Sequence, residues 1–121
     1  MAHEQKSMVS PSEWAEMYIY RVDYSPEDEG YIGTVLELPG LSHFAETNVE
    51  AIVGIIQATK EALAILEEEG KHIPEPLNLR KYSGKFNVRI SPALHRKLTQ
   101  NAALANQSLN QYIAQALERA A

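Results

Sequence analysis

A short alternating segment near the C-terminal end constrains this chain more than any other feature. In residues 85–90, KFNVRI, polar and apolar side chains alternate. This period of two predicts a strand with one buried face. A lone two-faced strand is not stable, so it needs a partner strand. The residues that follow it have helical patterns, which leaves the same strand of a second chain as the simplest partner.

Two helices are predicted directly after this strand. Ser91-Pro92 provides an N-cap and a proline at the first helical position. Asn106 can adopt the left-handed conformation that ends a helix, and Ser108 is the N-cap of a second helix over residues 109–120. The apolar faces of residues 84–121 are too many for so small a unit to bury alone, which predicts an obligate dimer. The predicted dimer core contains Phe86, Val88, Ile90, Leu94, Leu98, Ile113 and Leu117.

The charge is divided unevenly along the 121 residues. Residues 1–79 carry 4 Lys/Arg and 15 Asp/Glu, a net charge of −11, whereas residues 80–121 carry 7 Lys/Arg and one Glu, a net charge of +6. This division favours two small modules with different partners, a basic one for a polyanion and an acidic one for a basic protein. Solvated surface charge is the alternative interpretation.

Composition excludes several classes. The chain has no cysteine, and therefore no disulfide framework or thiolate chemistry. It has no apolar run near the roughly 20 residues of a membrane span. Its N-terminal residues are too polar for a signal peptide. We therefore expect a cytoplasmic protein with no membrane partner.

The acidic half has the pattern of an antiparallel meander. The predicted strands span residues 17–24, 31–38 and 41–46, with a hairpin loop at residues 25–30. Pro39-Gly40 fits a type II turn, in which the glycine has a positive φ. Residues 1–16 are predicted to be a loose N-terminal segment, from which Trp14 can pack onto the domain.

A long amphipathic helix follows the meander. Thr47 with Glu50 fits a capping box, and Gly70 fits a C′ stop. The helix is about 22 residues long, or on the order of 33 Å. Glu67, Glu68 and Glu69 lie in its last turn, where the helix dipole disfavours acids. They are either a frayed, solvated helix end or an acidic patch for a basic partner.

Residues 71–84 contain Pro74 and Pro76, which exclude a continued helix. This segment is predicted to be an extended linker, with a short fourth strand at residues 77–79. It would separate a domain over residues 17–70 from one over residues 85–121.

Two strings of residues resemble a known family. SGKFNVRISPALHRKL, followed by SLNQYI, resembles the C-terminal part of the HicB antitoxin family, and residues 85–120 resemble a ribbon-helix-helix domain of the Arc/MetJ type. A meander carrying ELPGL, a helix opening on TNVEA and an IPEP exit resemble the degenerate RNase H-like domain of HicB proteins. Asn106 stands where such domains often have glycine.

The resemblance implies an α+β protein. Its N-terminal part would be a three- to four-stranded antiparallel sheet with one long covering helix, a partial RNase H-like fold. Its C-terminal part would be a ribbon-helix-helix that dimerises.

The resemblance also implies a function: a type II antitoxin that neutralises a HicA-type mRNA-cleaving toxin and represses its own operon. The paired strands would enter the major groove and read bases with Lys85, Asn87 and Arg89. The N-terminus of the second helix, Ser108, Leu109 and Asn110, would hold a phosphate. The implied partners are a second copy, with a higher oligomer left open, double-stranded operator DNA and a small basic toxin.

Enzymatic activity is not expected, and neither is a cofactor or a metal. RNase H chemistry needs carboxylates that converge on divalent metals, and the candidates are Asp23, Glu37, Glu46 and Glu50. No spacing among them requires a metal cluster, and the four histidines have no ligand spacing. An orphan ribbon-helix-helix regulator with a ligand-sensing or residual nuclease domain is the alternative.

Overall fold

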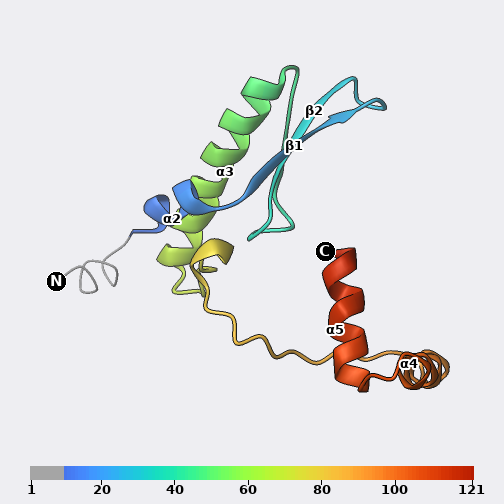
Figure 1. Cartoon of the computed structure of the whole chain (residues 1–121). Coiled ribbons are helices and arrows are strands. Elements are labelled where there is room, and N and C mark those ends of the chain that lie inside the picture. Colours follow the sequence, from blue (N-terminus) through green and yellow to red (C-terminus); the bar gives the residue numbers. More distant parts are fainter. Residues whose placement is uncertain (1–9) are drawn as a thin grey trace. The chain divides into compact units, whose positions relative to one another are not determined.

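Residues 10–121, which the computed structural model describes, divide into two units. The first extends to Tyr82, and the second comprises Ser83–Ala121 (Figure 1). The described residues contain one three-stranded sheet and four α-helices, which confirms the predicted mixture of α and β structure. None of these helices has the length and apolarity that a membrane span requires.

The sheet of the first unit is the predicted antiparallel meander. Its strands are β1 (Tyr20–Ser25), β2 (Gly30–Val35) and β3 (Ser42–Ala45), in the order β1-β2-β3. The registers pair Val22 with Gly33 and Gly33 with His43. All three strands are shorter than predicted. The first starts late because residues up to Met17 are helical, and the second ends early because the chain turns at residues 36–40.

The predicted type II turn at Pro39-Gly40 is wrong in type. The amide of Leu41 donates to the carbonyl of Leu38 at 3.0 Å, so a turn does form there. Gly40, however, is not among the residues with a positive φ, which a type II turn requires. Proline at the second position also suits type I, so the sequence pair fixes a turn without fixing its type.

Helix α3 (Asn48–Glu68) covers one face of the sheet and contacts all three strands (Figure 1). The Thr47 hydroxyl accepts from the Glu50 amide at 3.1 Å, which confirms Thr47 as the N-cap. The predicted capping box is incomplete, because the Glu50 carboxylate accepts from the Thr47 hydroxyl and not from its amide. At the other end, Gly70 has a φ of 69° and Lys71 N–H donates to the carbonyl of Leu66, as in a Schellman motif. The fully buried side chains of this helix are Ala51, Ile55, Thr59 and Leu63.

Glycine lets α3 approach the sheet closely. A Cβ on Gly33 would lie 2.7 Å from the Ala51 carbonyl oxygen and 2.9 Å from Cγ2 of Ile55. We therefore expect Gly33→Ala to lower the free energy of unfolding by about 1–3 kcal/mol. Gly40→Ala is the matched control, since a Cβ there meets nothing within 4 Å. Urea unfolding measures both, and equal stabilities of the two variants would contradict the packing described.

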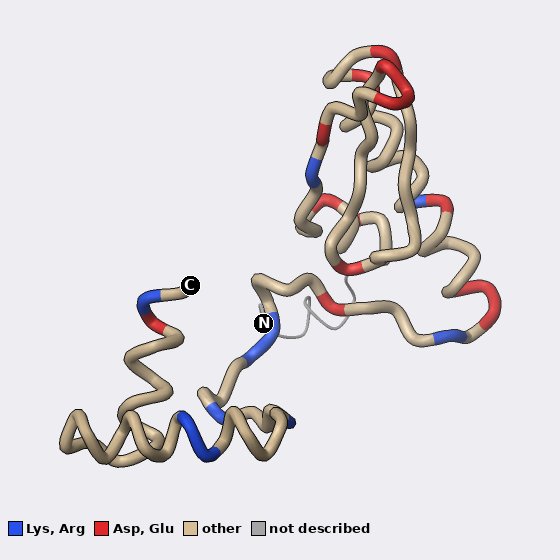
Figure 2. Tube along the Cα trace, turned by 90° about the vertical axis from the view of Figure 1, so that its right-hand side faces the viewer, with Lys and Arg blue, Asp and Glu red and all other residues tan. Residues whose placement is uncertain are grey.

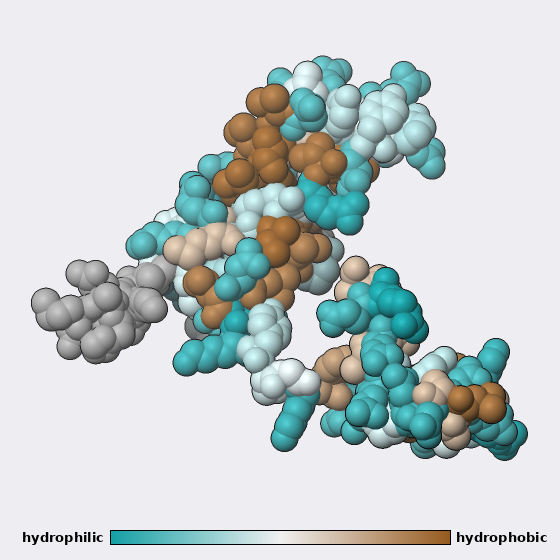
Figure 3. Space-filling view, viewed as in Figure 1, coloured by the Kyte–Doolittle hydropathy of each residue, from teal (hydrophilic) through white to brown (hydrophobic). Residues whose placement is uncertain are grey.

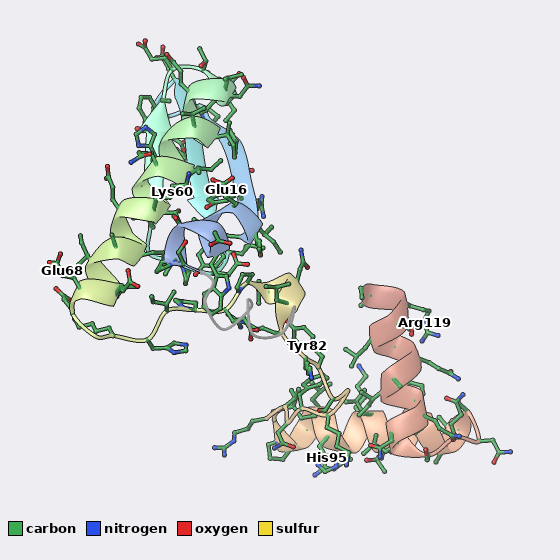
Figure 4. The ribbon with its side chains drawn as sticks, turned by 90° about the vertical axis from the view of Figure 1, so that its left-hand side faces the viewer. Glu16, Lys60, Glu68, Tyr82, His95 and Arg119 are labelled. Carbon is green, nitrogen blue, oxygen red and sulfur yellow. The ribbon has the colours of Figure 1, made fainter. Side chains whose placement is uncertain are left out.

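The predicted loose N-terminal segment is wrong for its described part. Helix α2 (Pro11–Met17) begins at a capping box between Ser10 and Glu13, and Ala15 is fully buried. Glu16 pairs with Lys60 of α3 at 2.7 Å, and the two side chains meet between the helices in Figure 4. Trp14 packs against the core as predicted. The rest of the expected loose segment, residues 1–9, lies outside the described residues.

The predicted linker and fourth strand also require correction. Residues 77–79 form a single 3₁₀ turn, η1 (Leu77–Leu79), and not a strand. Pro76 is fully buried, and Ile73 packs against the core of the first unit. The chain therefore stays attached to the first unit as far as η1, because its prolines fit an apolar site that local sequence patterns do not reveal.

The second unit consists of α4 (Pro92–Leu104) and α5 (Leu109–Ala120), both within a residue of their predicted bounds. Ser91 caps α4, and its hydroxyl accepts from the Leu94 amide at 3.1 Å. Asn106 has a φ of 59°, and Gln107 N–H donates to the carbonyl of Ala102, which confirms the predicted helix stop. Ser108 and Gln111 form a capping box at the start of α5.

Candidate nucleic-acid interface and partner-binding surfaces

The segment of residues 85–90 forms no strand within the single chain. Its side chains are exposed, with 71% of Phe86, 66% of Val88 and 37% of Ile90 accessible. Lys85 is the one residue of this segment with a local hydrogen bond, in which its amide donates to the Ser83 hydroxyl. The backbone groups of this segment are open to water, and its apolar side chains form an exposed stripe of the kind that marks a binding surface.

The polar residues predicted to read bases, Lys85, Asn87 and Arg89, are all exposed. A hollow of about 550 Å³ lies between this segment and the start of α4. It is lined by Asn87, Val88, Arg89, Ile90 and His95. Figure 4 shows His95 on α4 beside the extended segment. The polar and apolar sides of the segment are therefore both accessible in one chain.

The helices of the second unit bury almost nothing by themselves. Ala102 is the one residue of this unit with a buried side chain. Among the predicted dimer-core residues on α4 and α5, Leu94 and Leu117 are exposed, and Leu98 and Ile113 are half-buried. One buried alanine is far too small a core for a stable unit, which agrees with the argument for a dimer from the sequence.

The N-terminus of α5 begins with a capping box and leaves two backbone amides free. The capping box uses the Ser108 and Gln111 amides at 3.0 and 3.1 Å. The amides of Leu109 and Asn110 are in the first turn, where no helical carbonyl can accept from them. Of the three residues predicted to hold a phosphate, two therefore offer amides, and Ser108 fixes the turn that presents them.

The two units carry net charges of opposite sign, and the distribution of Lys, Arg, Asp and Glu is shown in Figure 2. Residues up to Tyr82 carry 6 Lys/Arg and 15 Asp/Glu, a net charge of −9. Ser83–Ala121 carries 5 Lys/Arg and one Glu, a net charge of +4. The first unit has no Lys or Arg between Arg21 and Lys60. A polyanion is thus attracted to the second unit and repelled by the first.

The acids Glu67, Glu68 and Glu69 are exposed at the end of α3, where Figure 4 shows Glu68 pointing outward. Glu69 pairs with Lys71 at 3.1 Å. This cluster is therefore partly neutralised by a neighbour on its own chain.

Glu37 has a structural role that its local sequence does not predict. Glu37 is 6% exposed, and its two oxygens accept from the amides of Ile19 at 3.0 Å and Leu77 at 2.9 Å. The Tyr18 hydroxyl donates to the carbonyl of Pro74 nearby. Burial, together with the Glu37 charge, raises the pKa of Tyr18 to about 12. No local pattern signals these bonds, which join residues up to 56 apart in sequence.

The other candidate carboxylates are dispersed. Asp23 pairs with Arg21 at 3.1 Å, and Glu50 bonds its own N-cap threonine. In residues 10–121, no three His, Cys, Asp or Glu side chains gather as a metal would require. His43 lies on β3 against Gly54 of α3, where it packs between sheet and helix.

Comparison with known proteins finds one relationship. Residues 67–117, less than half of the chain, are similar to the HicB family model. The matched stretch contains the end of α3, η1, the exposed segment 85–90 and nearly all of α4 and α5. No curated protein and no solved structure matches the chain.

Proposed function

We propose that this protein is the antitoxin of a type II toxin–antitoxin system. Its acidic first unit binds and neutralises a small, basic, mRNA-cleaving toxin of the HicA type. Its second unit dimerises and represses the antitoxin's own operon by binding operator DNA. The HicB-family match over residues 67–117 supports this class of function.

The observation that carries the proposal is the exposed, unpaired segment 85–90. Pairing with the same segment of a second chain satisfies the backbone groups and covers Phe86, Val88 and Ile90 together. The two strands then form a ribbon that presents six side chains, Lys85, Asn87 and Arg89 from each chain. Such a two-stranded ribbon fits the major groove of B-DNA.

The chemistry of these side chains suits base reading. Arg or Lys can donate to O6 and N7 of guanine, and Asn can pair with adenine, at roughly 1–3 kcal/mol of discrimination for each good pair. The free amides of Leu109 and Asn110 hold the backbone phosphate and set the position of the ribbon.

Arg89→Ala is expected to abolish specific operator binding and to leave the dimer folded, since Arg89 is on the exposed polar side of the segment. Two guanine contacts are lost per dimer, so affinity for the operator falls by at least about tenfold to one-hundredfold. Arg119→Ala is the matched control, because Arg119 is an exposed cation in the last turn of α5. Titration of the upstream promoter fragment in a gel-shift assay measures both variants. Normal binding by Arg89→Ala rejects the ribbon assignment.

The toxin part is tested with the small basic protein encoded beside this chain's own gene. The proposal expects the two proteins to co-purify, and the complex to lose the RNA cleavage that the basic protein shows alone. A neighbouring gene of another kind, or a basic protein that ignores this chain, favours an orphan regulator.

The proposal gives the first unit a partial RNase H-like fold without catalysis. Three of the four candidate carboxylates, Asp23, Glu37 and Glu50, have partners within the fold. Metal-dependent RNA cleavage by the purified chain, lost in Asp23→Asn, would establish the nuclease alternative instead.

A further inference from the structure

One face of the first unit's sheet is not covered by any described element of that unit. Gly33 of β2 and His43 of β3 both contact α3, so the odd-numbered residues of these two strands face the helix. The alternating positions face the other way. In register, they place Arg21 beside Thr34 and Asp23 beside Ile32, with Phe44 beside Ile32 in turn. The open sheet face therefore consists of Arg21, Asp23, Ile32, Thr34, Ser42 and Phe44.

This face combines exposed apolar side chains with hollows. Phe44 is 48% exposed and lies over Gly30, which has no side chain to cover it. Asp28, Ile32, Ser42 and Phe44 line a recess of about 400 Å³. A second recess on the same face is lined partly by Leu36, which is also exposed. Apolar side chains are also exposed on α3 (Figure 3), among them Val49, Val53 and Ile65.

The charges around the face have one dominant sign. Asp28 is on the rim of the first recess, and Glu27 and Glu29 belong to the same hairpin loop. The β2–β3 register places Glu46 beside that loop, since Tyr31 pairs with Ala45. Arg21 is the one cation on the face, and it is paired with Asp23.

From these observations we infer that the open sheet face is the surface that binds the basic toxin. The inference rests on the proposed antitoxin function and specifies where the partner docks. The partner presents an apolar side chain that enters the recess beside Phe44, surrounded by Lys or Arg side chains that meet Asp28 and the hairpin acids. The predicted acids Glu67, Glu68 and Glu69 lie outside this surface, at the far end of α3.

Charge complementarity selects this occupant over the alternatives. Nucleic acid is repelled by the acids around the recess. A second copy of the first unit carries the same negative charge on the same face, so self-association there brings like charges together. A basic protein gains attraction from the rim and contact from the recess, and a recessed aromatic residue is a common centre of binding energy.

The experiment measures binding of the full-length chain to the small basic protein encoded beside its gene, by isothermal titration calorimetry at low and high salt. Phe44→Ala is expected to weaken binding at least about tenfold. Its matched control is Val53→Ala, an apolar truncation at an exposed site on α3. Asp28→Asn keeps the hydrogen bond with Ser25 and is expected to weaken binding about two- to fivefold at low salt only. Glu61→Gln on α3 is its control.

Each outcome of this experiment supports or overturns the proposed binding surface. Unchanged affinity in Phe44→Ala and Asp28→Asn, with a native circular dichroism spectrum, overturns this surface and leaves the antitoxin function standing. Loss of affinity in Val53→Ala alone moves the site to α3. A lower oligomeric mass of Phe44→Ala in sedimentation assigns the face to a second copy instead. Absence of binding by the unmodified chain overturns the proposed function and, with it, this surface.

Discussion

Phe86→Ala is expected to dissociate the proposed dimer at concentrations where the unmodified chain is dimeric. Phe86 is 71% exposed in the single chain, so its apolar surface is buried only by a partner. Truncation of a buried phenylalanine costs about 3–5 kcal/mol, and the dimer contains two of them. The dissociation constant therefore rises by at least about one-hundredfold, at tenfold per 1.4 kcal/mol. Sedimentation velocity over a range of concentrations measures the change.

Leu104→Ala is the matched control for this variant. Leu104 lies at the end of α4 with 86% of its side chain exposed, and it is not part of the predicted dimer core. The control is expected to keep the dimer. If Phe86→Ala remains as dimeric as Leu104→Ala, then the dimer is made by another surface. Operator binding is expected to be lost together with the dimer, since half a ribbon reads half a site.

Glu37→Ala is expected to release residues 73–82, the exit segment, from the first unit. The substitution leaves the part-buried amides of Ile19 and Leu77 without their acceptors, at up to about 1–3 kcal/mol for each unsatisfied group. The free energy of unfolding of the first unit is therefore expected to fall by about 2–5 kcal/mol. Residues 73–82 are also expected to become a preferred site of proteolytic cleavage.

Glu75→Ala is the control for Glu37→Ala, because Glu75 is an exposed glutamate of the same exit segment. Urea unfolding and limited proteolysis followed by mass spectrometry measure both variants. Equal stability and equal cleavage patterns would show that the Glu37 carboxylate does not hold the segment. The consequence is that few residues connect the two units, because residues 73–79 pack on the first unit.

Local sequence signals predict the parts of this fold that local chemistry determines. Ser91-Pro92, Asn106 and Ser108 predict the boundaries of α4 and α5 because caps and left-handed stops act within one turn of the chain. Thr47 and Gly70 do the same for α3, and the three strands follow from β-branched and aromatic runs bounded by turn residues.

The elements that the sequence mispredicts depend on contacts between distant residues. Glu37 is one acid among many in the sequence, and only the assembled sheet and exit segment bury it between two amides. The short helix α2 is held by Ala15 and Glu16 against residues that follow it by more than forty positions. The 3₁₀ turn at Leu77–Leu79 likewise forms where the chain docks on the first unit.

The structure of a single chain tests only part of the candidate site. The exposure of Lys85, Asn87 and Arg89 agrees with their predicted role, and the exposure of Phe86, Val88 and Ile90 agrees with the need for a partner. Pairing of the two strands and contact with DNA remain predictions. The open sheet face was not foreseen, because a sequence pattern does not specify which face of a meander its helix covers.

Hydrogen exchange of residues 85–90 tests the central claim most directly. In the proposed ribbon, the amides of this segment bond to a second chain, so their exchange slows as concentration rises through the dimerisation range. We expect strong protection in the dimer and rapid exchange on dilution, with α3 protected throughout. Rapid exchange of residues 85–90 in a sample that sedimentation shows to be fully dimeric would contradict the ribbon and the DNA-reading role built on it.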